Sequence, residues 1–296
     1  PILATPFDEG ENLDLESFGR MVRFMADVGA DGVTIIGVLG ESGRMVDIER
    51  ERLIKAAVAA ADGRIPVIVG TSHEGTHATR YLSQMAESLG AGGVMVTPSR
   101  EPVPGEDRVF EYFRQAVQGI SIPVVVQDHP ASTEVHMSVE LMLRIVREIP
   151  GVACIKEEAP PTPARIAALI RGMTSRKVPI LTGLGALYGL FDLECGSSGF
   201  MTGFAFPEVL IALVRAVREN RMGDAWDLYR RFLPLIVFEQ QPGIAVRKEI
   251  LRMRGLIASG RVRHPGSGLN PEAAAQLRAL LDRTLPGVDL TRPLAL

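Results

Sequence analysis

Short apolar runs alternate with amphipathic helical segments along most of the chain, and this alternation limits the possible folds more than any other feature. Each run is bounded by glycine, proline or small polar residues, as buried strands usually are. Between the runs, apolar residues recur at intervals of three and four, which is the spacing of one helix face. The strands predicted in this way cover residues 1–7, 31–37, 66–70, 93–98, 123–127, 152–156, 178–183 and 198–203.

Eight strand–helix units, spaced by roughly 25 to 30 residues, favour a closed (β/α)8 TIM barrel of the α/β class. An open, doubly wound sheet is the alternative, and eight regular units make it the less favoured one. The predicted barrel covers residues 1–220, and residues 221–296 form a C-terminal helical extension that packs on it. The helices of the extension are expected over residues 224–238, 243–257 and 271–285, with Pro234 interrupting the first.

The composition is that of an ordinary globular protein, with 46% hydrophobic and 23% charged residues. The formal net charge is −3, so no electrostatic case exists for binding nucleic acid or an anionic membrane. Cys154 and Cys195 lie in apolar contexts without metal-ligand spacing, and no disulfide framework is implied. No signal peptide and no apolar run of about 18 residues is visible, so a cytoplasmic location is expected.

The segment 152–158 carries the first indication of chemistry. An apolar run of four residues ends in Lys156, and Glu157 and Glu158 follow it. In parallel α/β proteins, catalytic groups gather at the carboxyl ends of the strands. A lysine whose stem lies among apolar groups is desolvated, which favours a neutral amine that can attack a ketone and form a Schiff base. The alternative is a lysine that leaves a core strand for solvent. One of the two acids is expected to face the pocket, because successive side chains alternate.

Other polar residues are predicted to share the catalytic face. His73 and His129 follow strands and could be general acids or bases, although histidines in loops are more often structural. Glu41 lies in the glycine-rich loop 37–43, where a structural carboxylate is favoured over an acid catalyst. The glycine spacing is not that of a phosphate-binding or dinucleotide-binding loop, so a small carboxylate held by backbone N–H groups fits better. Arg100 could bind an anion or be a solvated charge.

The strand-end motifs resemble those of one enzyme family. They are Thr5-Pro6-Phe7, Gly37-x-x-Gly40-Glu41-Ser42, Thr97-Pro98 and Ile155-Lys156, which stand in the order and spacing of the dihydrodipicolinate synthase/N-acetylneuraminate lyase family. The resemblance covers essentially the whole chain, including the helical tail. It implies a (β/α)8 barrel, a homo-oligomer (tetramer or dimer), and a Schiff base between Lys156 and a 2-keto acid, with no metal or organic cofactor.

Several residues depart from the pattern of that family. Its carboxylate-binding loop has hydroxyl residues between the glycines, whereas Val38 and Leu39 stand here. Gln127 replaces the strand-five tyrosine that relays protons, and Ser132 stands where dihydrodipicolinate synthases place an arginine. These departures argue against dihydrodipicolinate synthase activity.

A narrower resemblance is to the 2-keto-3-deoxy-L-arabinonate dehydratase branch, whose members remove water from a 3-deoxy-2-keto sugar acid. One difference is that Leu184-Gly185-Ala186 lack the acidic residues of that branch. The resemblance is carried by Thr71-Ser72-His73, Val126-Gln127-Asp128-x-Pro130-Ala131-Ser132, Met201-Thr202-Gly203-x-x-x-Pro207 and Ile257-Ala258-Ser259-x-x-x-Arg263-His264-Pro265.

The expected function is therefore that of a Schiff-base lyase that dehydrates a 2-keto-3-deoxy sugar acid. Lys156 is the expected nucleophile, and Gln127 is expected to orient a water or a substrate hydroxyl. A pyruvate-dependent aldolase or synthase and a non-catalytic sugar-acid-binding barrel are the alternatives, because one fold hosts many functions. The residues expected to bind the substrate are Val38, Leu39, Gly40, Asp128, Thr182, Gly183, Met201 and Thr202.

Overall fold

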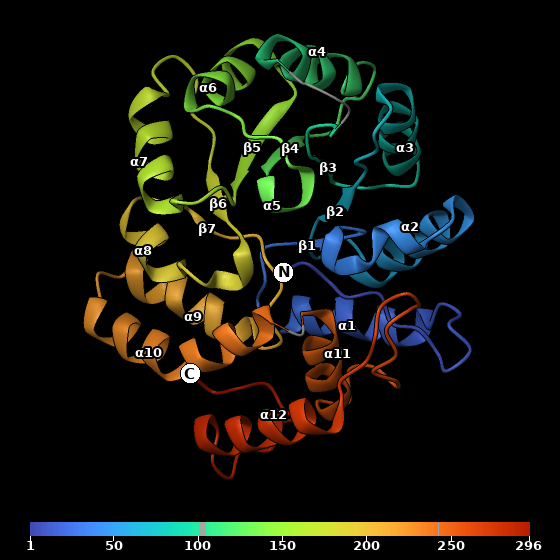
Figure 1. Ribbon diagram of the computed structural model, residues 1–296, viewed down its shortest axis with the longest axis vertical. Coiled ribbons are helices and arrows are strands. Elements are labelled where there is room, and N and C mark those ends of the chain that lie inside the picture. The colour runs from blue at the N-terminus through green and yellow to red at the C-terminus, as the bar shows by residue number, and fades with distance from the viewer. Residues whose placement is uncertain (101–104, 242) are drawn as a thin grey trace.

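The computed structural model describes residues 1–100, 105–241 and 243–296, which form a curled parallel sheet surrounded by helices (Figure 1). Seven strands pair in chain order, each parallel to the next. The α/β class predicted from the alternating pattern is therefore confirmed. The strands are β1 (Val33–Ile35), β2 (Val67–Gly70), β3 (Gly93–Val96), β4 (Val124–Asp128), β5 (Val152–Glu157), β6 (Ile180–Thr182) and β7 (Gly199–Phe200).

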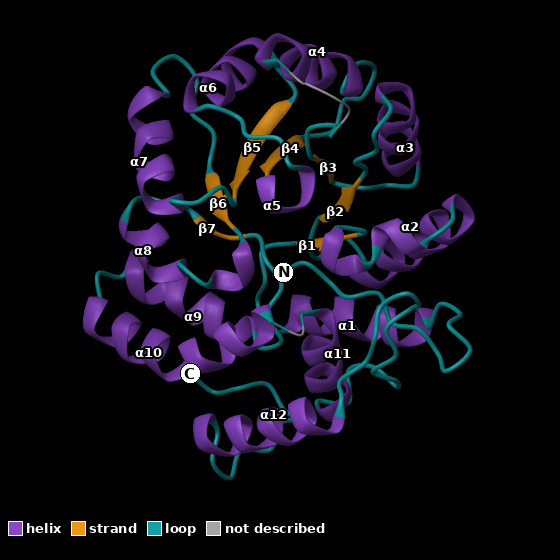
Figure 2. Ribbon diagram, in the orientation of Figure 1, coloured by secondary structure: helices purple, strands orange, loops and turns teal. Residues whose placement is uncertain are grey.

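Helices connect the strands and surround the sheet (Figure 2). Asp14 and Ser138 cap α1 and α6, as their side chains accept hydrogen bonds from backbone N–H groups of the first turn. The long connecting helices are α1 (Leu15–Asp27), α2 (Asp47–Ala61), α3 (Thr76–Ser88), α4 (Glu106–Ala116), α6 (Val139–Glu148), α7 (Thr162–Gly172) and α9 (Pro207–Arg218). Shorter elements are η1 (Val38–Gly40), η2 (Ser42–Arg44), α5 (Pro130–Thr133), η3 (Leu184–Ala186) and α8 (Gly189–Glu194).

Residues 1–7 do not form the predicted strand, so that part of the prediction is wrong. Only an isolated parallel bridge joins Ile2 to Thr34 beside β1. On its other side, the N–H of Ile2 donates to the carbonyl of Thr202 at 2.9 Å, just beyond β7. The segment thus links the two edges of the sheet, but Pro6 has no N–H with which to extend the ladder.

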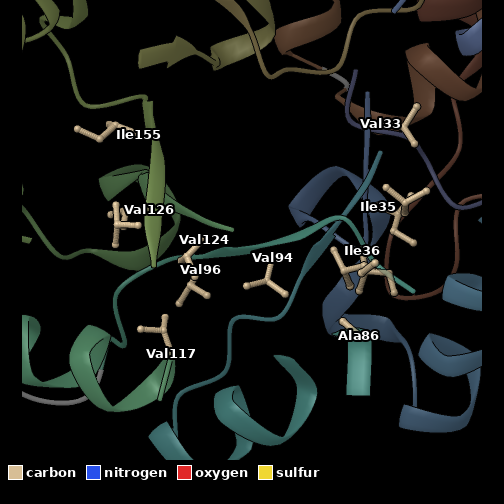
Figure 3. Packing of buried hydrophobic residues seen from close by; sticks show 14 of the residues in the cluster. Val33, Ile35, Ile36, Ala86, Val94, Val96, Val117, Val124, Val126 and Ile155 are labelled. Atoms are coloured by element: carbon tan, nitrogen blue, oxygen red, sulfur yellow. The ribbon is translucent and has the colours of Figure 1, made fainter. Parts of the chain in front are cut away.

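Side chains of the strands alternate between two apolar layers. The outer layer lies between sheet and helices, and Figure 3 shows members of it, among them Val94, Val126 and Ile155. The inner layer lies inside the curled sheet and contains Val125 of β4 and Cys154 of β5. Gln127 and Lys156 lie two residues further along the same strands. Their side chains therefore continue the inner layer at the carboxyl ends of β4 and β5.

The chain after residue 221 forms α10 (Met222–Gln240), α11 (Ile244–Met253) and α12 (Pro271–Thr284). A second apolar cluster packs these helices against α8 and α9. Helix α10 runs on past Pro234 to Gln240, so the predicted interruption is absent. Within the described residues, no helix has both the length and the apolar character needed to cross a membrane.

Candidate active site

Lys156 lies in β5, with its side chain buried on the inner side of the sheet. In the parallel register it stands opposite Gln127 of β4 and Leu181 of β6. Its Nζ lies 2.8 Å from Oε2 of Glu158. The lysine predicted as the nucleophile thus stays in the interior, with a carboxylate next to its amine.

Glu158 joins the two residues predicted to be catalytic. The oxygen that contacts Lys156 also accepts a hydrogen bond from Nε2 of Gln127 at 2.6 Å. The other carboxylate oxygen accepts the N–H of Leu184 at 3.0 Å. A side chain at Gly183 would overlap this carboxylate, so the close approach requires glycine there. Lys156, Glu158 and Gln127 are all buried, and we call them the lysine–carboxylate cluster.

Glu158 was not among the residues predicted to be catalytic. The available signal was the alternation of side chains along a strand, which puts residues 156 and 158 on one side. Burial alone would raise the pKa of the Glu158 carboxyl, but the positive charges of Lys156 and His129 draw it below its ordinary value. Glu158 is therefore an anion placed to accept the proton that the amine must lose before it attacks a carbonyl.

A cavity of about 720 Å³ lies at the carboxyl ends of β1 to β4. Its volume falls within the range of small-molecule sites, and it combines apolar walls with a few polar groups, as such sites usually do. Gln127 connects it to the lysine–carboxylate cluster, because its side chain lies in the wall and donates to Glu158. Other residues in the wall include Leu39, Ser72, His73, Thr97, Arg100 and Ser132.

The loop predicted to hold a carboxylate forms the two helical turns η1 and η2 along this cavity. The hydroxyl of Thr5 donates to the carbonyl of Gly40 at 2.6 Å and ties the loop to the N-terminal segment. Leu39 packs against the inner apolar layer, whereas Val38 is exposed. Neither side chain can donate a hydrogen bond, which leaves backbone N–H groups as the donors this stretch can offer.

Two predicted substrate-binding residues lie on the other side of the sheet. Oδ2 of Asp128 is 2.5 Å from Nη2 of Arg165, and the hydroxyl of Thr182 donates to Asp192 of α8. Both are register partners of Glu157, so their side chains point opposite to Lys156. Their placement does not support direct contact with a substrate.

The other predicted residues lie at or near the carboxyl face. Met201 belongs to the inner apolar layer, and the hydroxyl of Thr202 accepts the N–H of Gly185 at 2.7 Å. His129 is half-buried, with Nδ1 2.6 Å from the hydroxyl of Ser132, and burial lowers its pKa. His129 thus lies behind Ser132, which reaches the cavity wall.

Asp128 and Glu157 share a single arginine, and this arrangement predicts a pH dependence of stability. Burial and the neighbouring Asp128 raise the pKa of Glu157 from 4.5 to about 7, against the opposing effect of Arg165. Between about pH 4.5 and 7 the folded protein therefore binds more protons than the unfolded chain. Stability consequently falls as the pH rises through this window.

Glu157→Gln mimics the protonated carboxyl and should remove much of this fall. We expect the variant to exceed the unmodified protein in free energy of unfolding by roughly 1–3 kcal/mol at pH 8, with a smaller difference at pH 5. Urea unfolding at both pH values measures this difference, and Glu272→Gln, at an exposed position of α12, is the control. A Glu157→Gln variant that is less stable at pH 8 would contradict the assignment.

Comparison with known proteins agrees with this geometry. Residues 1–284 match the Dihydrodipicolinate synthetase family. The chain is 38% identical to L-2-keto-3-deoxyarabonate dehydratase of Azospirillum brasilense over 97% of this chain and 94% of the relative. It is 32% identical to 4-hydroxy-tetrahydrodipicolinate synthase of Persephonella marina, over 94% and 95% of the two chains. The crystal structure of dihydrodipicolinate synthase from Rhodopseudomonas palustris superposes with a TM-score of 0.91 at 34% identity, over 95% of each chain. The chain therefore belongs to the dihydrodipicolinate synthetase family of lyases, as its strand-end motifs predicted.

Proposed function

We propose that this protein is a Schiff-base dehydratase of a 2-keto-3-deoxy sugar acid such as 2-keto-3-deoxy-L-arabinonate. The observation that carries the proposal is the lysine–carboxylate cluster. It puts an amine and a carboxylate 2.8 Å apart, beside a cavity large enough for a small sugar acid. The similarity to the Azospirillum brasilense dehydratase supports the choice of substrate class.

The first half of the reaction forms an imine. Glu158 takes a proton from Lys156, and the neutral amine attacks C2 of the keto acid, whose carboxylate rests on the loop 37–42. A proton then passes from the attacking nitrogen to the former carbonyl oxygen, and the protonated Glu158 returns its own proton to the resulting C2 hydroxyl, which leaves as water. A protonated imine remains on Lys156, with the Glu158 carboxylate again an anion beside it.

The second half expels the C4 hydroxyl. The imine withdraws electrons, so Glu158 can remove a proton from C3 and give an enamine. The enamine electrons form the C3–C4 double bond as the C4–O bond breaks, and the proton on Glu158 goes to the departing hydroxide. Gln127 holds Glu158 in place through the 2.6 Å hydrogen bond. Proton shifts along the carbon chain and hydrolysis of the imine then release 2-oxoglutarate semialdehyde and free Lys156.

A pyruvate-dependent aldolase is the second candidate, and the similarity to synthases of this family favours it. The same imine would then drive cleavage of the C3–C4 bond instead of loss of the C4 hydroxyl. Among the described residues that line the cavity there is no tyrosine to take a proton from a C4 hydroxyl. This favours dehydration over cleavage.

The proposal extends to the organisation of the protein. We place a closed (β/α)8-type barrel over residues 1–220, in which the N-terminal segment closes the gap between β1 and β7 through the bridge at Ile2, and a helical extension over 221–296. The closure is supported by the hydrogen bonds of Pro1 and Leu3 to Thr34 of β1 and by that of Ile2 to Thr202, just beyond β7. A cytoplasmic homo-oligomer that takes a small 2-keto acid, without metal or organic cofactor, completes the proposal.

Product analysis tests the function directly. Incubation with 2-keto-3-deoxy-L-arabinonate is expected to yield 2-oxoglutarate semialdehyde, with little pyruvate or glycolaldehyde. Chromatography with mass detection separates these products, and a Lys156→Ala sample serves as the blank. Pyruvate plus glycolaldehyde as the main products would establish the aldolase instead. Absence of both product sets would exclude this substrate.

A further inference from the structure

Lys248 and Glu41 form a buried ion pair that links α11 of the C-terminal extension to the loop beside the cavity. Nζ of Lys248 lies 2.5 Å from Oε1 of Glu41, and both side chains are almost completely buried. The same Nζ donates to the carbonyl of Arg261 at 2.6 Å and lies 4.5 Å from the centre of the Phe7 ring. The pair thus joins the N-terminal segment, the cavity loop and the tail.

The Glu41 carboxylate is held from two further directions. Its Oε2 is 2.7 Å from Nη1 of Arg44 and accepts the backbone N–H of Arg263 at 3.1 Å. Arg263 is itself fixed by both carboxylate oxygens of Glu49 in α2, at 2.8 and 2.7 Å. A carboxylate with this many charged contacts is a structural anchor, which agrees with the favoured interpretation of Glu41 from the sequence.

The loop between β1 and α2 is strained at the position that these contacts hold. Glu41 has a φ of 57°, in the left-handed region where residues other than glycine are uncommon. Ile36, at the start of the loop, has a φ of 58°, which is a stronger outlier because its side chain is β-branched. Such conformations persist only where the surrounding structure imposes them. The ion pair with Lys248 is one of the contacts that impose this one.

We propose that Lys248 is a positioning residue for substrate binding, which acts through Glu41 to fix the loop 37–44 in the conformation that holds the carboxylate of the 2-keto acid. This inference rests on the proposed function, in which that loop holds the carboxylate. Ile244 and Pro265, two more residues of the extension, line the same cavity. The extension is thereby part of the substrate site.

The charges around Lys248 predict a pH dependence of binding. Glu41 and Arg44 face it from the cavity loop and Arg263 from the tail, with Glu49 of α2 behind Arg263. Burial lowers the pKa of Lys248 to about 8, and Glu41 opposes this shift. Above about pH 8 the lysine loses its charge, so Glu41 loses one of its two cationic partners, and the loop is held less firmly. An arginine at this position would keep its charge.

The test measures how much pyruvate is needed to form the imine. Borohydride reduces the imine, and intact mass gives the pyruvate concentration at half-maximal adduct. Lys248→Met is expected to raise this concentration by roughly tenfold, within the usual range of coupling between sites. In the unmodified protein, the half-maximal pyruvate concentration should rise above about pH 8, as Lys248 loses its charge. Lys248→Arg should have a half-maximal pyruvate concentration near that of the unmodified protein at neutral pH and should show little of this rise.

Arg254→Met is the matched control. Arg254 is also a buried cation at the end of α11; it lies 2.5 Å from Oε1 of Glu208, donates to the carbonyl of Ala205 and packs over Phe206. Among the described residues, its hydrogen-bond, ion-pair and ring partners all lie outside the cavity loop, so its loss should destabilise the tail without changing the half-maximal pyruvate concentration.

The positioning role would be overturned if the half-maximal pyruvate concentration changed equally in Lys248→Met and Arg254→Met, or changed in neither variant. If Lys248→Met does not fold, the pH series of Lys248→Arg decides. A half-maximal pyruvate concentration that rises above pH 8 as much in Lys248→Arg as in the unmodified protein would overturn the positioning role. If the unmodified protein forms no adduct, the proposed function fails, and amide hydrogen exchange then tests the positioning role alone. Exchange over residues 37–44 should quicken in Lys248→Met but not in Arg254→Met, and unchanged exchange in Lys248→Met would overturn the role.

Discussion

Replacing Lys156 with alanine is expected to abolish the borohydride-trapped adduct with 2-keto acids. Turnover should fall by roughly 10³-fold or more, the scale seen when a covalent nucleophile is removed. The reason is that the amine buried at the end of β5 is the group placed to form the imine beside Glu158. Intact mass after reduction measures the adduct, and product formation measures turnover.

Lys177→Ala is the control, because Lys177 is an exposed lysine that the reaction does not need. Circular dichroism and thermal unfolding show whether Lys156→Ala keeps its fold, since the change leaves the buried Glu158 without its cation. Lys156→Arg keeps that charge and should also lack the adduct. An adduct of unchanged yield in a folded Lys156→Ala variant would refute the assigned nucleophile.

Glu158→Gln is expected to separate imine formation from turnover. The amide keeps the size of the side chain but cannot accept and return a proton, so turnover should fall by roughly 10²- to 10⁴-fold. The adduct should still form, more slowly, because Lys156 is intact and can lose its proton to water. The measurement compares the yield of trapped adduct with the rate of product formation, in Glu158→Gln and in the unmodified protein.

The matched control is Glu157→Gln, the same substitution one residue earlier on the other side of β5. Its carboxylate binds Arg165 and the N–H of Ala159 outside the cavity, so turnover near that of the unmodified protein is expected. Equal losses of turnover in both variants would mean that Glu158 acts by supporting the strand and not by transferring protons.

The strands around the site were predictable because buried parallel strands are apolar on both faces and end at polar residues. The run before Lys156 therefore marked both the strand and its carboxyl end. The side of the sheet on which an individual side chain lies was harder to predict, because a shift of one residue along a strand moves the side chain to the other side. Asp128 and Thr182 were expected in the site for their position at strand ends, yet both point to the helix layer.

Two features had no local signal in the sequence. Residues 1–7 are apolar enough for a strand, but their pairing reduces to the hydrogen bonds around Ile2, which depend on the sheet curling until its edges approach. The contact between Glu41 and Lys248 joins residues far apart along the chain. Glu41 could be interpreted as a structural carboxylate from its glycine-rich loop, but nothing in the sequence indicated that Lys248 would be its partner, because a lysine in a helix usually lies at the surface.

Reduction with borohydride during turnover of 2-keto-3-deoxy-L-arabinonate, followed by peptide mass mapping, tests the central claim most directly. The chain has four lysines, Lys55, Lys156, Lys177 and Lys248, so the modified one can be identified without ambiguity. The account predicts five-carbon adducts on Lys156, one with the mass of the reduced substrate imine and one lighter by a molecule of water. An adduct confined to another lysine, a three-carbon adduct alone, or no adduct during turnover would contradict it.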